Sequence, residues 1–260
     1  MINYGFSLYT FEYFLMILVR VAMFVFIAPF FGMNNTPNRV KVGFSVFLAI
    51  VLYQTIQPKE VLEYSGVIGF AIIILKEGIT GLLIGYAANI CNSIIVFSGK
   101  VIDMEIGLAM ANMYDPMTKA QSGLTGTMYN YFIMILLIVT DMHHYILRAL
   151  VDTYQVVPVN GAEFNWDHLL GSMLMYMVDM MIIGFRIALP IFACSMILSC
   201  ILGIMAKVAP QMNMFAVGMQ IKVLLGLSIM FLTIALLPNI SGMIFTEMKR
   251  MIVSMIEGMY

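Results

Sequence analysis

The 260-residue chain is strongly apolar, with 62% hydrophobic residues and a mean hydropathy of +0.97. This composition is typical of integral membrane proteins and argues against a soluble domain. Thirteen basic residues nearly balance fourteen acidic ones, giving a formal charge of −1, which argues against a nucleic-acid surface or a polybasic lipid anchor.

The first predicted elements form a hairpin of two short helices. Residues 21–38 and 42–58 carry no charged side chain and lie near the lower length limit of a membrane-spanning helix. The piece from Pro29 to Pro37 between them predicts a turn. Because no basic residue precedes Arg20, the positive start of a cleavable signal peptide is missing, and the first apolar segment is expected to remain in the mature protein.

A third apolar segment covers residues 66–97 and contains adjacent charges at Lys76 and Glu77. Adjacent residues do not face each other on a helix, so each of these charges is expected to find its partner elsewhere. Gly81 and Gly85 lie four residues apart and form a small face. Such a face predicts close approach of a second helix.

Further apolar segments cover 123–140, 145–159, 169–207 and 223–246, and a hydrophilic loop at 160–168 interrupts them. The 169–207 segment is too long for a simple span and contains a proline, so a kinked or bent helix is expected. No linker rich in serine, glycine or proline divides the chain. A single domain over residues 1–260 is predicted.

The end of the chain predicts an amphipathic C-terminal helix over 242–260. Its apolar residues recur at helical spacing, while polar residues occupy the other positions. Two interpretations stay open: a helix lying at the bilayer surface, or a docking helix for partner subunits. The residues with helical spacing are Ile244, Met248, Met251, Ile252, Met255, Ile256 and Met259.

Ionisable residues lie within or at the edges of the apolar segments. A charge facing hydrocarbon costs about 2.5–3.5 kcal/mol on insertion scales, so such groups normally turn toward protein or water. The helices are therefore expected to pack largely against other protein. These residues are Glu12, Arg20, Lys76, Glu77, Asp179, Arg186, Lys207 and Lys222.

The segment 107–123 is a predicted loop between two apolar segments. Asp115 precedes Pro116, a position that disfavours helix, and Gly107 and Gly123 permit backbone geometries that other residues avoid. The first half of the segment is apolar and rich in methionine. Irregular backbone at membrane depth is tolerated only when buried in protein or lining a cavity, so a plugging loop and a plain connecting loop both stay open.

A polar group of Asp141, His143 and His144 follows the 123–140 segment. Adjacent histidines on one helix point in different directions, and no metalloprotease, serine-hydrolase or paired-aspartate motif accompanies them. A polar helix end beside a turn accounts for the three residues. We therefore expect no catalysis, no metal and no cofactor.

An ordered set of residues spans nearly the whole chain. Its most specific members are Asp115-Pro116 and the run from Ala209 to Phe215. The set comprises Arg20, Ala28-Pro29, Gly32, Pro37, Arg39, Lys41, Leu48-Ala49, Pro58, Lys76-Glu77-Gly78, Gly81, Gly85, Gly99 to Pro116, Asp141 to His144, Leu150 to Thr153, Pro158, Ala209 to Phe215, Val217-Gly218, Lys222 and Gly226-Leu227.

This order resembles the FliR family of the flagellar type III export apparatus and its injectisome counterpart, SctT. Two positions depart from the family pattern: Met142 stands where glycine is common, and Gln220 where proline is common. Both departures concern local turn geometry. Neither falls in the 107–123 segment.

The resemblance implies an all-α, multi-helix integral membrane protein with bent helical hairpins, packed in a helical hetero-oligomeric assembly. It implies FliP-like and FliQ-like subunits as partners, together with an FlhB-like subunit and membrane lipid, and no nucleic acid. The expected place is the bacterial inner membrane at the flagellar basal body. There the assembly forms the gate through which unfolded substrates leave the cytoplasm.

The resemblance also implies roles for particular residues. The family's loop corresponding to 107–123 is thought to plug the export pore, and the embedded charges become candidate subunit contacts, with an internally satisfied ion pair as the alternative for each. The candidate pore plug comprises Leu108, Met110, Met113, Tyr114, Asp115, Pro116 and Met117. The candidate subunit contacts are Arg20, Lys76, Glu77, Asp179, Arg186 and Lys222.

A secondary transporter is the alternative function, because broken helices with intramembrane charges also mark ion and substrate sites. That class commonly carries internal repeats. The chain shows a faint echo: Ala28-Pro29 precedes Lys41, and Ala209-Pro210 precedes Lys222, at the same offset. Chance accounts for this echo as well as duplication does.

Overall fold

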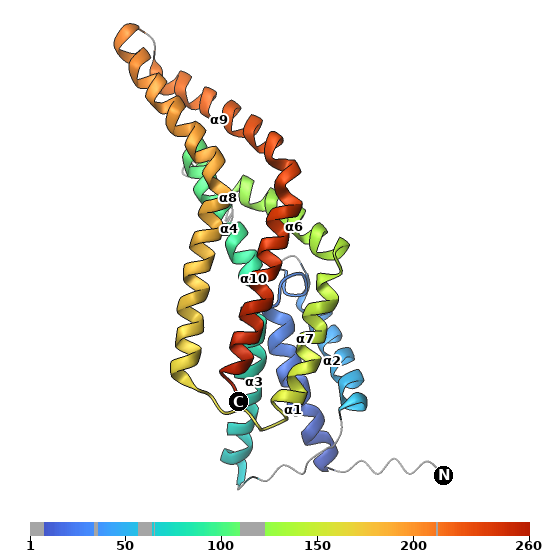
Figure 1. Cartoon of the computed structure of the whole chain (residues 1–260). Coiled ribbons are helices and arrows are strands. Elements are labelled where there is room, and N and C mark those ends of the chain that lie inside the picture. Colours follow the sequence, from blue (N-terminus) through green and yellow to red (C-terminus); the bar gives the residue numbers. More distant parts are fainter. Residues whose placement is uncertain (1–7, 34–35, 57–63, 65, 110–122, 212) are drawn as a thin grey trace. The chain divides into compact units, whose positions relative to one another are not determined.

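The computed structural model describes residues 8–33, 36–56, 64, 66–109, 123–211 and 213–260 (Figure 1). In that part of the chain the regular structure is entirely helical, so the all-α prediction is confirmed. The elements are α1 (Leu8–Ile27), α2 (Asn38–Thr55), α3 (Gly66–Ala88), α4 (Ile90–Ile106), α6 (Leu124–Val139), α7 (Met142–Val156), α8 (Trp166–Val208), α9 (Met214–Thr233), the 3-10 helix η1 (Ile234–Leu236) and α10 (Leu237–Glu257).

The predicted N-terminal hairpin is present as α1 and α2. After α1 the chain turns, and Phe30 adopts a left-handed backbone conformation with φ of 68°. Lys41 of α2 is buried and donates from Nζ to the carbonyl oxygen of Gly32 at 3.0 Å. This basic residue at the edge of an apolar segment thus ties the start of α2 to the turn that precedes it.

Two apolar segments are interrupted where the sequence predicted continuity. The 66–97 segment divides at Asn89 into α3 and α4. The 223–246 run divides at η1, and Pro238 follows as the second residue of α10, where its missing N–H leaves no helical bond unmade. In contrast, α8 passes through Pro190 as one 43-residue helix, so the predicted disturbance there does not end the helix.

The helices form two compact units built from interleaved segments. Unit 1 comprises Met1–Ile90, Asp141–Tyr176 and Glu247–Tyr260, and unit 2 comprises Cys91–Thr140 and Met177–Thr246. The chain crosses between the units four times, and three of these crossings lie inside helices, in α4, α8 and α10. No linker composition marks these three crossings because they lie inside helices.

Each unit has an apolar core of its own. In unit 1, α1 packs against α2 and α3, and Met16, Ile17 and Phe24 of α1 are fully buried. In unit 2, α4 and α6 supply six fully buried isoleucine and leucine side chains. They are Ile94, Ile95, Ile102, Ile106, Ile133 and Leu137.

The apolar stripe of the 242–260 segment is buried by the chain itself. Met248, Met251 and Met255 have no exposed area. The carbonyl oxygens of Gly258 and Met259 accept the N–H groups of Asn165 and Glu163 at 3.0 and 2.9 Å. The stripe therefore faces neither the bilayer surface nor a partner subunit, the two interpretations that the sequence left open.

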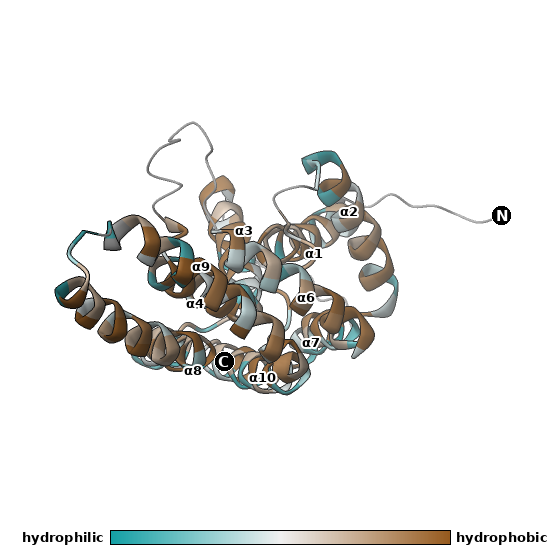
Figure 2. Ribbon diagram, turned by 90° about the horizontal axis from the view of Figure 1, so that it is seen from above, coloured by the Kyte–Doolittle hydropathy of each residue, from teal (hydrophilic) through white to brown (hydrophobic). Residues whose placement is uncertain are grey.

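Four described stretches are long and apolar enough to cross a membrane, and a broken pair gives a fifth if its helices form one span. Apolar residues dominate the ribbons of these helices in Figure 2. Their length and composition suit a membrane protein. The stretches are Tyr9–Ile27, Gly66–Ala88, Trp166–Val208 and Ala216–Glu257, and the pair is Leu124–Val139 with Met142–Val156.

Candidate functional site

A buried ion pair joins α1 to α3 in unit 1. Arg20 Nε lies 2.6 Å from Glu77 Oε2, and Arg20 Nη2 lies 3.0 Å from Glu77 Oε1. Neither side chain has any exposed area. Two parallel bonds match the planar guanidinium to the carboxylate, the strongest arrangement that such a pair can adopt.

Backbone groups that follow α7 form further hydrogen bonds with both members of this pair. Arg20 Nη1 donates to the carbonyl oxygen of Val157 at 2.9 Å, and Nη2 donates to that of Pro158 at 3.3 Å. Glu77 Oε1 accepts the N–H of Asn160 at 2.9 Å. A buried pair is tolerated only when such extra bonds offset its desolvation, and here they come from a third part of the chain.

The ring of Tyr154 covers the charged group. The guanidinium carbon of Arg20 lies 4.3 Å from the ring centre, within cation–π range. The Tyr154 hydroxyl donates to the carbonyl oxygen of Ile17 at 3.4 Å. The pair therefore connects α1, α3 and α7.

Glycines on α3 let its backbone reach α1 beside the ion pair. A Cβ added at Gly81 would collide with the carbonyl of Arg20, and one at Gly85 would lie 3.0 Å from the carbonyl oxygen of Phe24. The predicted face of small residues on α3 is confirmed, and the helix that packs closely against it is α1.

In unit 2, α4 and α6 lie on either side of the predicted plug segment. Gly107 follows α4 with φ of 85°, a conformation that favours glycine and ends helices. At the other end, Gly123 precedes α6 and offers no side chain for capping. Asp103 of α4 supplies the cap instead, because its Oδ1 accepts the N–H of Thr125 at 3.3 Å.

Asp103 is only 3% exposed, and burial raises the pKa of its carboxyl, partly offset by the hydrogen bonds from Thr125. Its Oδ2 has no hydrogen-bond partner among the described residues. A Cβ at Gly123 would collide with this oxygen, so a larger residue there would displace the Asp103 carboxylate from the cap. Gly99 and Gly126 bring the two helices together, since a Cβ at Gly99 would collide with the Gly126 backbone.

Comparison with known proteins identifies the family. Residues 11–248 match the model of the bacterial export proteins, family 1. The chain belongs to this family. It is 30% identical to the flagellar biosynthetic protein FliR of Bacillus subtilis (strain 168) over 82% of each chain. FliR of Escherichia coli (strain K12) is 22% identical over 92% of this chain and 91% of its own, and that of Aquifex aeolicus is 26% identical over 84% and 83%.

The resemblance that residue order predicted is thus confirmed. The relatives align over most of their own length, and the matched region covers all of unit 2 and unit 1 except residues 1–10 and 249–260. The buried ion pair, the glycine contacts and the Asp103 cap all lie in that region as well.

The candidate plug lies largely outside the described residues. Only Leu108 is described, half-buried after the end of α4. The remaining members of the set lie outside: Met110, Met113, Tyr114, Asp115, Pro116 and Met117. What the structure adds to the prediction is the geometry of the two ends.

The candidate subunit contacts divide into two groups. Arg20 and Glu77 pair with each other inside unit 1 and have no exposed area. They form an internally satisfied ion pair, the alternative to a subunit contact. The prediction that Glu77 has a partner away from Lys76 is confirmed. Outside this pair, Lys76, Asp179 and Lys222 are half-buried and Arg186 is exposed.

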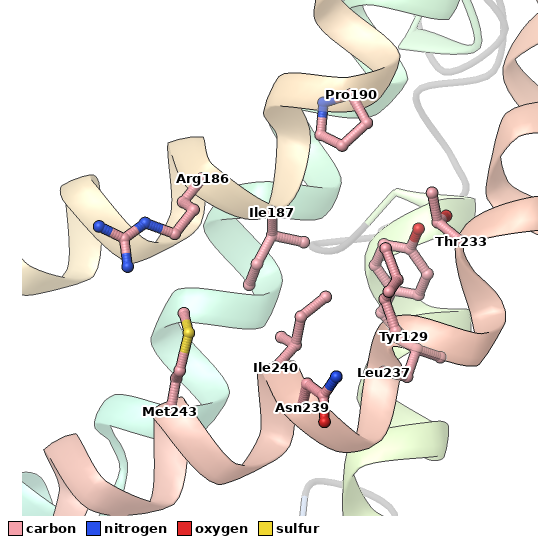
Figure 3. A pocket seen from close by; sticks show the side chains of 10 residues that line it. Tyr129, Arg186, Ile187, Pro190, Thr233, Leu237, Asn239, Ile240 and Met243 are labelled. Atoms are coloured by element: carbon pink, nitrogen blue, oxygen red, sulfur yellow. The ribbon is translucent and has the colours of Figure 1, made fainter.

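Arg186 lines an apolar cavity of about 250 Å³ in unit 2 (Figure 3). Its guanidinium points away from Ile187 and Ile240, which face the cavity. An exposed cation on an apolar helix needs water, a lipid headgroup or an acidic partner. The lining residues are Tyr129, Arg186, Ile187, Pro190, Thr233, Leu236, Leu237, Asn239, Ile240 and Met243.

Sequence reasoning missed three residues of these sites. Asp103, Tyr154 and Asn160 carry no motif, and their partners are distant in sequence. A signal existed for Asn160, because asparagine before glycine favours a turn, and the residue adopts φ of 66°. Asp103 offered a weaker signal as an acidic residue within an apolar stretch.

Proposed function

We propose that this chain is a subunit of the flagellar type III export gate, helping to form and close the channel through which unfolded proteins cross the bacterial inner membrane. The observation that carries the proposal is the family match over residues 11–248. FliR relatives that align over most of their length and the membrane-length helices support it.

The surface of α8 needs a neighbour outside this chain. Only 22% of its most apolar stretch is buried by the chain itself. Exposed apolar surface on this scale requires lipid or partner subunits. FliP-like, FliQ-like and FlhB-like subunits are the proposed partners, and the flagellar basal body is the proposed location.

Isolation from membranes in mild detergent tests the assembly. An affinity-tagged chain should bring down FliP-like and FliQ-like subunits, identified by mass spectrometry, and deletion of its gene should abolish motility. A tagged unrelated membrane protein of the same cell is the control. Recovery of the chain only as a monomer or homodimer would contradict the proposal.

We further propose that segment 107–123 closes the channel. The support is an apolar, methionine-rich composition and two ends fixed by Gly107 and by the Asp103 cap on α6. Thioether and small side chains can seal a pore while holding it weakly, because they repack without strain.

Deletion of residues 109–117 should increase leakage of ions through the assembled gate. The reason is that the apolar half of the segment is removed while the Asp103 cap stays. The measurement is growth and membrane potential in cells expressing the assembled complex, with Lys119→Ala in the same segment as control. Unchanged permeability with normal recovery of the partner subunits would refute the plug.

A further inference from the structure

Three side chains that can ligate a metal lie together at the start of α7: Asp141, His143 and His144. Asp141 precedes the helix with φ of 57°, and its carboxylate does not cap the helix as an aspartate there commonly does. Its Oδ1 instead lies 3.4 Å from His144 Nδ1. Met142 is buried and fixes this turn to the core of unit 1.

His143 lies beside this pair. Its ring centre is 4.0 Å from that of His144 and 6.3 Å from that of Phe30. Its Nδ1 is buried and has no hydrogen-bond partner among the described residues. One ligand atom from each of Asp141, His143 and His144 lies within 4.8 Å of the other two.

We propose that Asp141, His143 and His144 bind a divalent transition metal of the zinc class. Two imidazoles and a carboxylate are ligands that Zn²⁺ accepts, at about 2.0–2.2 Å. Ligand atoms of a tetrahedral site with such bonds lie about 3.3–3.5 Å apart. The Asp141–His144 distance already agrees with this spacing.

The remaining adjustment is small. Asp141 and His144 are exposed and can rotate toward the half-buried His143, whose position the aromatic contacts restrict. An aspartate–histidine pair at a helix end accounts for Asp141 and His144. It does not account for the unsatisfied nitrogen of His143, which a metal ion would occupy or orient.

The three ligands leave at least one position for water. Because Asp141 directly precedes α7, a bound ion would connect the residue before the helix to its first turn. It would thereby hold these two parts of the chain together, with water at the open position.

Zinc binding to the purified full chain in detergent tests the proposal. Isothermal titration calorimetry with Zn²⁺ alone should show about one saturable site per chain. Co²⁺ in its place should give the visible absorption band of a four-coordinate site. His144→Ala and Asp141→Asn should each weaken binding by about tenfold or more, a scale that even the outer hydrogen-bond partners of metal ligands reach.

His168→Ala and Asp152→Asn are matched controls, because both residues are exposed and lie outside the cluster. They should leave the affinity unchanged. Circular dichroism of every variant confirms the helical fold. Absence of saturable binding, or an affinity that both cluster variants retain, would overturn the site without affecting the export function.

Discussion

Replacing Arg20 with methionine should lower the free energy of unfolding by about 3–5 kcal/mol, the usual cost of leaving one member of a buried ion pair alone. Glu77 would keep the Asn160 N–H but lose both bonds from Arg20. Glu77→Gln should also be destabilising, because the buried Arg20 guanidinium would then lack a negative partner. Titration with denaturing detergent in mixed micelles, followed by circular dichroism, gives the free energies.

The double variant Arg20→Met, Glu77→Leu separates the pair from its surroundings. It should be less destabilised than the sum of the single variants, because neither charge is left unpaired. Some cost should remain, since the carbonyls of Val157 and Pro158 lose their donor. Arg39→Met, at an exposed position, should change stability by less than about 0.5 kcal/mol. Equal effects of Arg39→Met and Arg20→Met would refute the structural role of the pair.

Gly99→Ala should destabilise unit 2 by about 1–3 kcal/mol, the typical cost of forcing an extra carbon into a close-packed contact. The added Cβ would meet the Gly126 backbone, which cannot rotate away as a side chain can. Thermal unfolding in detergent measures the effect. Motility should fall as well, because α4 and α6 flank the proposed plug.

Gly203→Ala is the matched control. This glycine also lies in a helix, yet a Cβ there meets nothing within 4 Å. Alanine should therefore stabilise the helix by about 0.5–1 kcal/mol, since it loses less conformational entropy on folding. A Gly99→Ala variant as stable as Gly203→Ala would contradict the close contact.

The sequence predicted the class of fold and the close-packing face of α3, because apolar runs and glycine spacing are local signals. It also singled out Arg20 and Glu77 as charges that must avoid lipid. Their pairing was not predictable, because the two residues are 57 positions apart and the carbonyls that complete the site lie beyond α7. Distant pairs leave no trace in the local pattern of a single sequence.

Other differences have physical causes of the same kind. The helix break at Asn89 has no proline or glycine at that position, so the apolar run predicted one continuous segment there. The stripe on α10 indicated an apolar face that needs covering, but the structure covers it with this same chain rather than with the bilayer surface or a partner subunit. Met248 and Met251 are buried within this chain. An amphipathic pattern is the same whether the apolar face packs against the same chain or against another molecule.

The interleaving of the two units has a consequence for biosynthesis. Unit 1 needs Glu247–Tyr260, whose methionines fill its core, and the ribosome makes these residues only after all of unit 2. During translation, α1, α3 and α7 are therefore complete before the segment that finishes the core of unit 1 is made. The buried ion pair needs only residues up to Asn160, so it can hold these helices together before the last segment arrives.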